Sequence, residues 1–546
     1  MKRKAVAAVL TAVMVASMFT GCGSDNGSSS AKSASAASAA SAANDTVDED
    51  GKVNGIMYQE GLPLVDEGDY TFSIFCDDSS ESGEFIMLDE FKKQTNVDVD
   101  LKIYPYETAT ERLNLDLNSG DYADVIGGWT LSDNAILTYG VNQGVFIPLE
   151  DYFEKYCPNI SAILDLPGVR EKMTAPDGHI YTIPYVCADT TVGYSPYINT
   201  KWLENVGMSM PTTTDEFEAV LKAFKEQDAN GNGDASDEIP FSTDPNNKHI
   251  EAMAGYFGLP MNQLGIAIQN EKVVYGGVSD TYREFLSWFH KLYAEGLVDV
   301  ELYTQDSSTW EGKGNQDLYG VSIAYGSNEF TGIPAAEERG DFDSMPVLNT
   351  DKDGIWLRDT EGFSVYRTQA VITNKAEHPE IICRWFDNAF ALENGIGCNR
   401  GPVGVIVNKE DDGYHAIDTT TLSEEDQEKY SWGNLWPQSL PKYLPVDFEF
   451  VEEHPMYDEK KATEEAYEAN LTKEIIPSYW IDLDKIDTFS DTNTAIKDFF
   501  EQQQAQFVCG ELDIDNDADW QAYVDGMYSL GLEDWVATQG IEKIAK

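Results

Sequence analysis

The hydrophobic pattern of the first folded segment predicts a strand, a helix and a second strand. Apolar and polar positions alternate in YTFSIF at 70–75 and strictly in VDVDLKI at 97–103, as they do in half-buried strands. Between the two runs, Phe85, Leu88 and Phe91 recur at helical spacing. This order indicates an α/β fold in which helices cover a sheet.

The pattern continues with a helix that ends near Gly120 and a third apolar strand over 123–126. Gly127, Gly128 and Trp129 follow that strand directly. Ligands of open α/β sheets bind beyond the carboxyl ends of the strands. We therefore expect a binding loop at these three residues.

Three later helices are also predicted. A capping box at 213–216 (TTDE) precedes an apolar periodic run and starts one helix. Amphipathic periodicity predicts two more helices over 282–293 and 379–391. Their aromatic residues are expected to pack in cores: Phe285, Trp288, Phe289, Trp385 and Phe386.

The N-terminal residues have the pattern of an export signal. A basic start is followed by an apolar run from Ala5 to Phe19, which is short for a membrane span but typical of a secretory signal. The run ends in FTGC, and this motif resembles the lipobox of bacterial lipoproteins, in which the Cys, here Cys22, is acylated. An ordinary signal peptide with an incidental Cys is the alternative. We expect a signal peptide over 1–21 and a lipidated Cys22 with a flexible Ser/Ala-rich tether over 22–66.

Composition and charge narrow the function classes. The chain has 546 residues, of which 42% are hydrophobic and 12% aromatic, so most of it is expected to fold. Its 96 acidic and 37 basic residues give a net charge of -59, which repels nucleic acids and anionic lipid headgroups. The six cysteines after Cys22 are widely spaced and without a C-x-x-C motif, so we interpret them as buried thiols.

One segment has the pattern of a calcium loop. Asp228, Asn230, Asn232 and Asp234 alternate with a Gly at the sixth position, as at the start of an EF-hand loop. The twelfth position is Ile239 rather than Glu, while Asp237 and Glu238 lie just before it. A polar turn is the alternative, but such crowded carboxylates favour a bound cation. We expect a structural Ca²⁺.

No motif of a common enzyme class is present. The chain lacks G-x-S-x-G, H-E-x-x-H, a Walker loop and G-x-G-x-x-G. A glycoside hydrolase remains open, because it needs only two suitably separated carboxylates. The six histidines are scattered without ligand spacing.

Taken together, these stretches resemble the extracellular solute-binding lipoproteins of bacterial carbohydrate ABC importers, a family 1 type group that includes calcium-containing oligosaccharide and alginate-type binders. The resemblance is carried by the lipobox and by EFKKQTNVDV (90–99), LNSGDYADVI (117–126), GVFIPLEDYFEKYCPNI (144–160), TAPDGHIYTIPY (174–185), HPEIICRWFDNAF (378–390), WQAYVDGMYSLGLEDW (520–535) and above all the stretch 197–241 with its D-x-N-x-N segment.

The resemblance implies a periplasmic-binding-protein-like fold, with two α/β lobes, a hinge and an interlobe ligand cleft. Lobe 1 would comprise 67–190 plus about 366–440, and lobe 2 would comprise 191–365 plus about 441–546 with the calcium loop at 228–238. The chain would cross between the lobes near 185–193, near 363–369 and again after Gly404. The calcium ligands it implies are Asp228, Asn230, Asn232, Asp234 through its carbonyl, Asp237 and Glu238.

A sugar cleft combines aromatic platforms with polar partners. The candidate platforms are aromatic residues in Gly-rich or polar loops, and loop packing is the alternative for each: Trp129, Tyr185, Trp310, Tyr325, Trp356 and Trp436.

The sequence thus predicts a binding protein rather than an enzyme. It would be a monomer, anchored as a lipoprotein at the outer face of the cytoplasmic membrane, that captures an oligosaccharide and delivers it to an ABC permease. The alternatives are a cell-surface glycoside hydrolase and a binder of peptides or other solutes on the same scaffold.

Overall fold

The computed structural model describes residues 45–78, 84–245, 249–332, 340–417, 419–446, 448, 450–451, 455–541 and 543–545. All of them belong to the compact unit Ala39–Lys546. The predicted signal peptide, Cys22 and the Ser/Ala-rich stretch up to residue 44 lie outside the described residues.

The predicted strand, helix and strand are present and form the start of a five-stranded sheet with the order β4-β3-β5-β13-β6. Strands β3 (Tyr70–Asp77), β4 (Val97–Tyr104) and β5 (Val125–Gly127) are parallel. Strand β13 (Phe363–Ile372) lies antiparallel between β5 and β6 (Thr182–Ala188). We call this sheet and its helices lobe 1.

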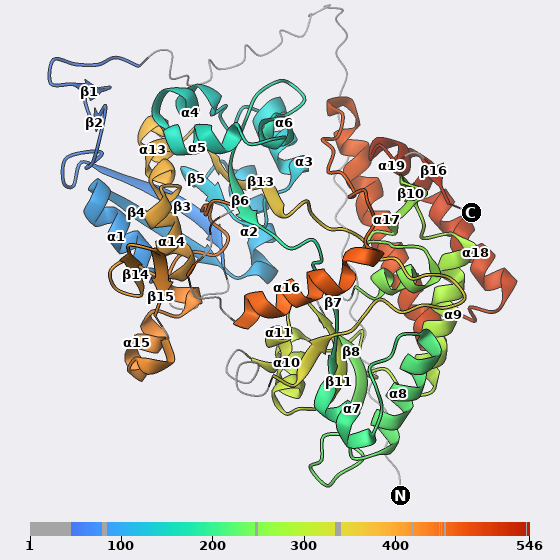
Figure 1. Cartoon of the computed structure of the whole chain (residues 1–546). Coiled ribbons are helices and arrows are strands. Elements are labelled where there is room, and N and C mark those ends of the chain that lie inside the picture. Colours follow the sequence, from blue (N-terminus) through green and yellow to red (C-terminus); the bar gives the residue numbers. More distant parts are fainter. Residues whose placement is uncertain are drawn as a thin grey trace, which may run out of the picture. The chain divides into compact units, whose positions relative to one another are not determined.

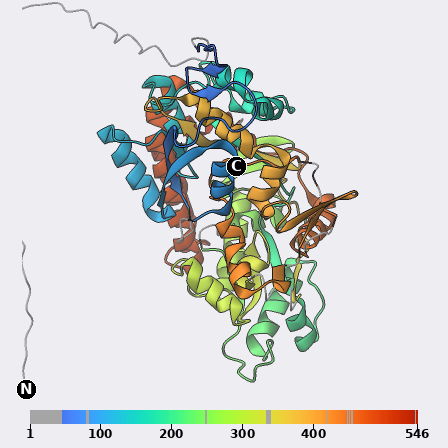
Figure 2. The same ribbon diagram turned by 90° about the vertical axis from the view of Figure 1, so that its left-hand side faces the viewer.

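Lobe 1 is built from segments far apart in the sequence. In both views the blue N-terminal strands lie beside the gold helices that follow β13 (Figures 1 and 2). Trp385 and Phe386, predicted to be core residues, are fully buried with the strands' apolar face. The helices of lobe 1 are α1 (Ile86–Thr95), α2 (Tyr106–Ser119), α3 (Asp133–Ala135), the π-helix η2 (Ile136–Asn142), α4 (Glu150–Tyr156), α5 (Pro158–Leu164), α6 (Val169–Met173), α13 (Pro379–Ala389) and α14 (Leu392–Arg400).

A second sheet with the order β12-β7-β11-β8 defines lobe 2. Its strands are β7 (Ser195–Asn199), β8 (Ile239–Thr243), β11 (Tyr319–Ala324) and β12 (Phe342–Ser344). Helix α8 (Thr214–Glu226) starts at the predicted position, where the hydroxyl of Thr213 accepts a hydrogen bond from the backbone N–H of Glu216 at 3.2 Å. The other helices near this sheet are α7 (Thr200–Val206), η3 (Ile250–Phe257), α9 (Asp280–Ala294), α10 (Ser307–Asn315) and α11 (Asn328–Thr331).

The C-terminal helices pack on the same core as α9. Helix α17 (Ile486–Cys509) contacts α9, α18 (Asp517–Ser529) and α19 (Leu532–Thr538). A small sheet, β16 (Lys543–Ile544), β10 (Lys272–Tyr275) and β9 (Ile266–Gln269), ties the C-terminus to this part of the chain. The remaining elements are β14 (Val407–Glu410), β15 (Gly413–Ala416), η4 (Thr419–Thr421), α15 (Glu424–Lys429), η5 (Trp432–Asn434), α16 (Pro455–Tyr467), η6 (Glu468–Asn470) and η7 (Leu483–Lys485).

The chain passes between the two sheets more than once. Residues 189–194 connect β6 of lobe 1 to β7 of lobe 2, and residues 359–362 lead from lobe 2 into β13. The chain then returns from lobe 1 to α16, which contacts β12 of lobe 2. These features agree with the predicted α/β class.

Residues 45–66, which the sequence analysis assigns to the tether, are folded onto lobe 1. Strands β1 (Lys52–Val53) and β2 (Met57–Tyr58) pair, and Val53, Met57, Leu64 and Val65 are buried in the lobe 1 core. The amide of Asn54 donates a hydrogen bond to the carboxylate of Glu380 at 2.9 Å. The apolar residues of this segment are spaced too irregularly to predict an element, but there are enough of them to anchor it.

In the described part of the chain, no helix combines the length and apolar character needed to cross a membrane. The six cysteines there are free thiols, and four of them are buried: Cys76, Cys157, Cys383 and Cys398.

Candidate functional site

Three aromatic side chains of lobe 1 lie close together beside the predicted binding loop. One follows β5, one is on β6 and one is on β13. Trp129 follows β5 and is 46% exposed, and its ring meets that of Tyr366 edge-on at 5.2 Å between centroids. Tyr366, on β13, stacks on Tyr185 of β6 at 5.5 Å and 18° between planes. We call these three residues the aromatic cluster. It offers both an exposed face and polar hydroxyl tips, as a sugar platform requires.

Asp77 holds the Trp129 loop in place. Its two carboxylate oxygens accept hydrogen bonds from the backbone N–H groups of Trp129 at 3.0 Å and Thr130 at 2.6 Å. Burial raises the pKa of Asp77, whereas these backbone donors act in the opposite direction. Gly128 is required beside it, because its φ is +137° and an added Cβ would lie 2.3 Å from the Asp77 carboxylate. Sequence reasoning missed Asp77, although it ends an alternating strand at the predicted edge.

A buried lysine, Lys442, contacts the aromatic cluster through the ring of Tyr185. The Lys442 ammonium donates a hydrogen bond to the Gln438 side chain at 2.6 Å and lies 5.7 Å from the ring centre of Tyr185. It also lies 5.4 Å from the ring centre of Trp432, which is 56% exposed. Burial lowers the pKa of Lys442 to about 8. These contacts link an unpredicted exposed tryptophan to the aromatic cluster.

Lobe 2 contributes a second group of aromatic side chains next to the crossing at 189–194. Tyr325 follows β11, and its hydroxyl donates a hydrogen bond to Asp189 at 3.2 Å. Tyr194 lies edge-on to Tyr325 at 6.0 Å and stacks on His249 at 3.9 Å. Burial lowers the pKa of His249 to about 4, so this imidazole is neutral at physiological pH. Tyr185 and Tyr325, both predicted, therefore lie on either side of a crossing between the lobes.

The crossing itself is tied together at Gly193. The backbone N–H of Gly193 donates to the Asp359 carboxylate at 2.7 Å, and its carbonyl accepts from Lys460 of α16 at 2.8 Å. The Lys460 ammonium also lies 3.7 Å from the ring centre of Tyr325. Burial raises the pKa of Asp359 to about 6 and lowers that of Lys460 to about 8. Residues from three separate chain passages thus meet at one glycine.

Two predicted platforms, Trp310 and Trp356, are core residues instead. Trp310 is buried in α10, with its indole N–H donating to Ser322 at 3.2 Å. Trp356 is buried between Tyr256 and Tyr467, at ring distances of 5.8 and 5.5 Å. Their polar and Gly-containing neighbours suggested exposed loops, but Trp310 lies in a helix and Trp356 lies in a segment whose backbone bonds to Asn470 and Thr472, and both indoles fill cores.

Trp436 is a core residue as well. It is fully buried against Phe91 and Trp385, at ring distances of 5.1 and 5.7 Å. The exposed tryptophan of the segment SWGNLW is Trp432. The two indoles are four residues apart, and the sequence does not distinguish which of them faces inward.

The loop that the sequence predicts to bind calcium lies between α8 and β8. The amides of Asn230 and Asn232 lie 3.3 and 2.7 Å from the two oxygens of Asp237. Asp228 accepts from the N–H of Gly233 at 2.9 Å, and Glu238 accepts from the N–H of Ala229 at 2.9 Å. The residues of the predicted ligand set are therefore brought together around one turn.

Two oxygens of this loop test whether a cation fits. Oδ1 of Asp228 and Oε2 of Glu238 are buried and accept no hydrogen bond. A buried carboxylate oxygen without a donor is costly, and a hard cation with oxygen ligands removes that cost. Asp234 instead accepts from the Ser236 hydroxyl at 2.6 Å, which leaves its carbonyl for the turn. The donor set fits Ca²⁺.

A further acidic group lies on the hairpin formed by β14 and β15. Ligand atoms of Glu410, Asp412 and His415 lie within 4.8 Å of one another, and both carboxylates are exposed. His415 is one of the six histidines that show no ligand spacing in the sequence and that we expected to be structural or surface residues. Exposed acidic groups of this kind are common without a metal.

Two α/β lobes, several crossings and exposed aromatic side chains at the ends of strands define a class of two-lobed ligand-binding proteins. The chain belongs to the bacterial extracellular solute-binding proteins, whose family profile matches residues 78–395. This confirms the family, the fold class and the prediction of a binding protein rather than an enzyme.

Named relatives give the comparison more detail. The chain is 31% identical over 411 residues to the fructooligosaccharide ABC transporter substrate-binding protein FusA of Streptococcus pneumoniae, covering 73% of this chain and 70% of that protein. It is 28% identical over 280 residues to Lipoprotein LipO of Bacillus subtilis, covering 50% of this chain and 52% of that protein.

Solved structures show the same fold. S. pneumoniae FusA in complex with kestose matches with a TM-score of 0.75 and 26% identity, over 86% of this chain and 98% of that chain. An EF-hand mutant of FusA in complex with fructo-nystose matches with a TM-score of 0.74 and 27% identity, over 86% of this chain and 98% of that chain. The alginate-binding protein AlgQ2 without calcium ion matches with a TM-score of 0.69 and 22% identity, over 88% of this chain and 99% of that chain.

Proposed function

We propose that this protein captures a neutral oligosaccharide of the fructooligosaccharide class and delivers it to an ABC importer. The observation that carries the proposal is the exposed ring of Trp129, held against Tyr366 by the Asp77 carboxylate. The name of the relative FusA, a fructooligosaccharide ABC transporter substrate-binding protein, supports this substrate class.

The charge of the chain favours an uncharged sugar. A net charge of -59 repels anionic oligosaccharides, whereas it has no such effect on neutral ones. Sugar rings present C–H faces to aromatic planes, and their hydroxyls need polar partners. We assign the platform role to Trp129, Tyr366 and Trp432 in lobe 1, with Tyr185 beneath Tyr366 and Tyr325 on the lobe 2 side.

Ligand capture would use a population shift. A sugar that contacts both lobes binds the closed arrangement more tightly and so increases its population. The predicted lobe boundaries, 67–190 plus about 366–440 and 191–365 plus about 441–546, are part of this proposal, with lobe 1 extended to residues 45–66, to the start of β13 at Phe363 and to Val446, all of which pack in its core. In this proposal the protein is a monomer, and after capture it delivers the sugar to the permease.

Calorimetry with kestose tests the proposed function. We expect saturable binding of kestose and none of maltotriose, a trisaccharide control of equal length. Product analysis of the same mixture separates the alternatives, because a binding protein returns kestose intact whereas a glycoside hydrolase releases smaller sugars. Binding of neither sugar, with binding of peptides instead, would favour the third alternative.

We further propose that the loop at 228–238 binds one structural Ca²⁺. The ligands would be Asp228, Asn230, Asn232, Asp237 and Glu238 with the Asp234 carbonyl. The two unpartnered buried carboxylate oxygens support this assignment, as does the EF-hand named for the relative FusA. The ion would hold α8 and β8 at a fixed angle, at a distance from the sugar chemistry.

Attachment through an acylated Cys22 is the remaining part of the proposal. The FTGC motif at 19–22 carries it, together with the printed name of the relative LipO, a lipoprotein. The protein would then act at the outer face of the cytoplasmic membrane. Cys22→Ala should move the protein from the membrane fraction to the medium, whereas retention in the membrane would contradict the lipobox.

A further inference from the structure

Two cysteines lie at the interface between the two stretches of chain that form lobe 1. Strands β3 to β6 come from the first stretch, and β13, α13 and α14 come from the second, after the insertion of lobe 2. Cys157 lies between α4 and α5 of the first stretch, and Cys383 lies on α13 of the second. Both are free thiols buried in the same core.

Asp387, one turn after Cys383 on α13, holds this helix against the start of α5. Its Oδ1 accepts a hydrogen bond from the backbone N–H of Ile160 at 2.8 Å, and its Oδ2 accepts from the Asn159 amide at 3.0 Å. Residues four apart on a helix share a face. The face of α13 that carries Cys383 is therefore turned toward the start of α5, and Cys157 is the residue directly before that helix.

The thiols of Cys157 and Cys383 form a hydrogen bond with each other. Burial raises the pKa of the Cys157 thiol well above its ordinary value, and the hydrogen bond with Cys383 acts in the same direction. The thiolate is the reactive form of cysteine, so the folded protein keeps Cys157 unreactive. In the unfolded chain the same thiol has an ordinary pKa of about 8.5 and reacts far more readily.

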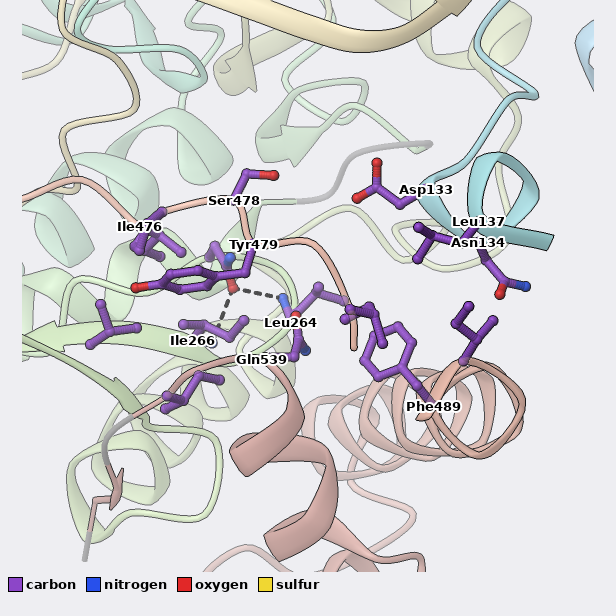
Figure 3. Close-up of a pocket in the computed structure, with 16 residues that line it drawn as sticks. Asp133, Asn134, Leu137, Leu264, Ile266, Ile476, Ser478, Tyr479, Phe489 and Gln539 are labelled. Carbon is purple, nitrogen blue, oxygen red and sulfur yellow. Dashed lines mark hydrogen bonds between the residues drawn. The ribbon is translucent and has the colours of Figure 1, made fainter. Parts of the chain in front are cut away.

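The contact of lobe 1 with the C-terminal segments is less closely packed. Figure 3 shows a cavity of about 290 Å³ there, with Leu137 of η2 on one side and Leu264 and Phe489 facing it. Atoms that line a void lack packing partners on one side. This contact therefore holds lobe 1 less firmly than a filled interface would, and a link within lobe 1 would compensate for that loss.

We propose that Cys157 and Cys383 form a disulfide as the chain folds in the extracellular medium, with a small-molecule disulfide of the glutathione type as the oxidant. The chain belongs to an extracellular family, and disulfides persist in oxidising extracellular surroundings. Thiols that hydrogen-bond each other are already neighbours, so their sulfur atoms need only a short approach to reach the bond length of about 2.05 Å. The bond joins the two stretches of lobe 1 across the insertion of lobe 2.

The bond forms by two exchange steps. The Cys157 thiolate attacks one sulfur of the small disulfide, which gives a mixed disulfide and releases one thiolate of the reagent. The Cys383 thiolate then attacks the Cys157 sulfur and releases the second thiolate. The two protein thiols are thereby oxidised, the small disulfide is reduced to two thiols, and the two cysteine protons pass to those thiols.

Refolding in a glutathione buffer tests the proposal. The purified protein is reduced and unfolded, refolded at pH 8 with oxidised and reduced glutathione, alkylated, and analysed by peptide mass spectrometry. We expect the peptides of Cys157 and Cys383 to be linked, whereas the other described cysteines should be alkylated: Cys76, Cys187, Cys398 and Cys509. The melting temperature should rise by about 5 °C or more over protein refolded without oxidant, because a crosslink constrains the unfolded chain.

Two variants complete the test. Cys383→Ala should remove both the link and the effect of the oxidant on the melting temperature. Cys398→Ala, at another buried position of the lobe 1 core, is the matched control and should keep both. If Cys383→Ala does not fold, the peptide map of the parent still decides. Alkylation of both Cys157 and Cys383, a link from either to another cysteine, or a melting temperature that the oxidant does not change would overturn the proposal.

Discussion

Lys460 and Asp359 bind opposite backbone groups of one residue, since the carbonyl of Gly193 accepts from the lysine and its N–H donates to the carboxylate. The three residues come from three different passages of the chain between the sheets. Gly193 therefore acts as a common attachment point for the hinge. We therefore expect a change in the angle between the lobes to affect both of these hydrogen bonds at once.

Gly193→Ala should disturb the hinge. The new Cβ would lie 2.8 Å from a carboxylate oxygen of Asp359, so that side chain must move and its bond to the backbone must weaken. We expect kestose affinity to fall roughly tenfold, or about 1.4 kcal/mol, with a smaller ligand-induced compaction in X-ray scattering. Gly312→Ala is the control, because beyond its own helix backbone and chain neighbours its added Cβ would meet nothing within 4 Å. Parental compaction in Gly193→Ala would contradict the hinge role.

Trp129 and Trp356 should respond in opposite ways to truncation. Trp129 is half-exposed, so Trp129→Ala should cost about 2 kcal/mol of binding, roughly thirtyfold in affinity, with little change in stability. Trp356 is buried, so Trp356→Ala should instead lower the free energy of unfolding by about 3–5 kcal/mol. Calorimetry and urea unfolding measure the two effects. Similar affinities for parent and Trp129→Ala would remove Trp129 from the site.

Asp77→Asn should weaken ligand binding through Trp129. The amide has one acceptor oxygen where the carboxylate has two, so one of the backbone N–H groups of Trp129 and Thr130 faces a donor instead. We expect a loss of about tenfold in affinity. If Asp77 acts by orienting Trp129, the double variant Asp77→Asn/Trp129→Ala should bind no more weakly than Trp129→Ala alone. Additive losses would indicate a separate role.

Lys442 should make the free energy of unfolding vary with pH in the alkaline range. Burial lowers its pKa from 10.5 to about 8, so between these values the unfolded chain binds more protons than the folded one. Stability contributed by this group therefore rises with pH across that window. Lys442→Met should reduce the slope of unfolding free energy by up to about 1.4 kcal/mol per pH unit.

Urea unfolding at pH 8, 9 and 10 measures this slope. Lys201→Met, at an exposed position on α7, is the matched control and should retain the parental slope. An unchanged slope in Lys442→Met would mean that the lysine titrates alike in both states.

Removal of calcium should destabilise the fold. An ion that binds only the native state adds to its stability, so a chelator should lower the melting temperature of the parent. Asp228→Asn should abolish that dependence and leave kestose affinity within about threefold. Asp513→Asn, among the four aspartates that alternate over 513–519 around the start of α18, should keep the chelator response. A parent that contains no calcium and melts alike with and without chelator would refute the site.

Periodicity predicted the elements well but not which loop aromatics are accessible. The strands over 70–75 and 97–103 and the helices over 282–293 and 379–391 follow from local spacing, and the structure contains them. Exposure of a loop tryptophan depends instead on distant partners. Trp356 is covered by Tyr467, more than a hundred residues later, and no local pattern records that contact.

The supporting residues of the site were missed for the same reason. Asp77 matters because the Trp129 loop returns to it from 52 residues away. Lys442 matters because it contacts the ring of Tyr185 on β6, which lies far earlier in the sequence. The loop proposed to bind calcium was easier to recognise, since its candidate ligands lie within eleven residues of sequence and start on alternate positions, as in known calcium loops.

The strand pair β1 and β2 determines which lobe receives a pulling force applied from the N-terminal side of the chain. Residues 45–66 are fixed to lobe 1 through the bond between Asn54 and Glu380 and through the Tyr156 hydroxyl, which donates to Asp45 at 2.8 Å. Tension applied from the N-terminal side therefore pulls on α4 and α13 and not on the hinge. If the protein is anchored through Cys22 and closes on a sugar as proposed, lobe 2 would move during closure while lobe 1 bears the pull of the anchor, so that pull would not oppose closure.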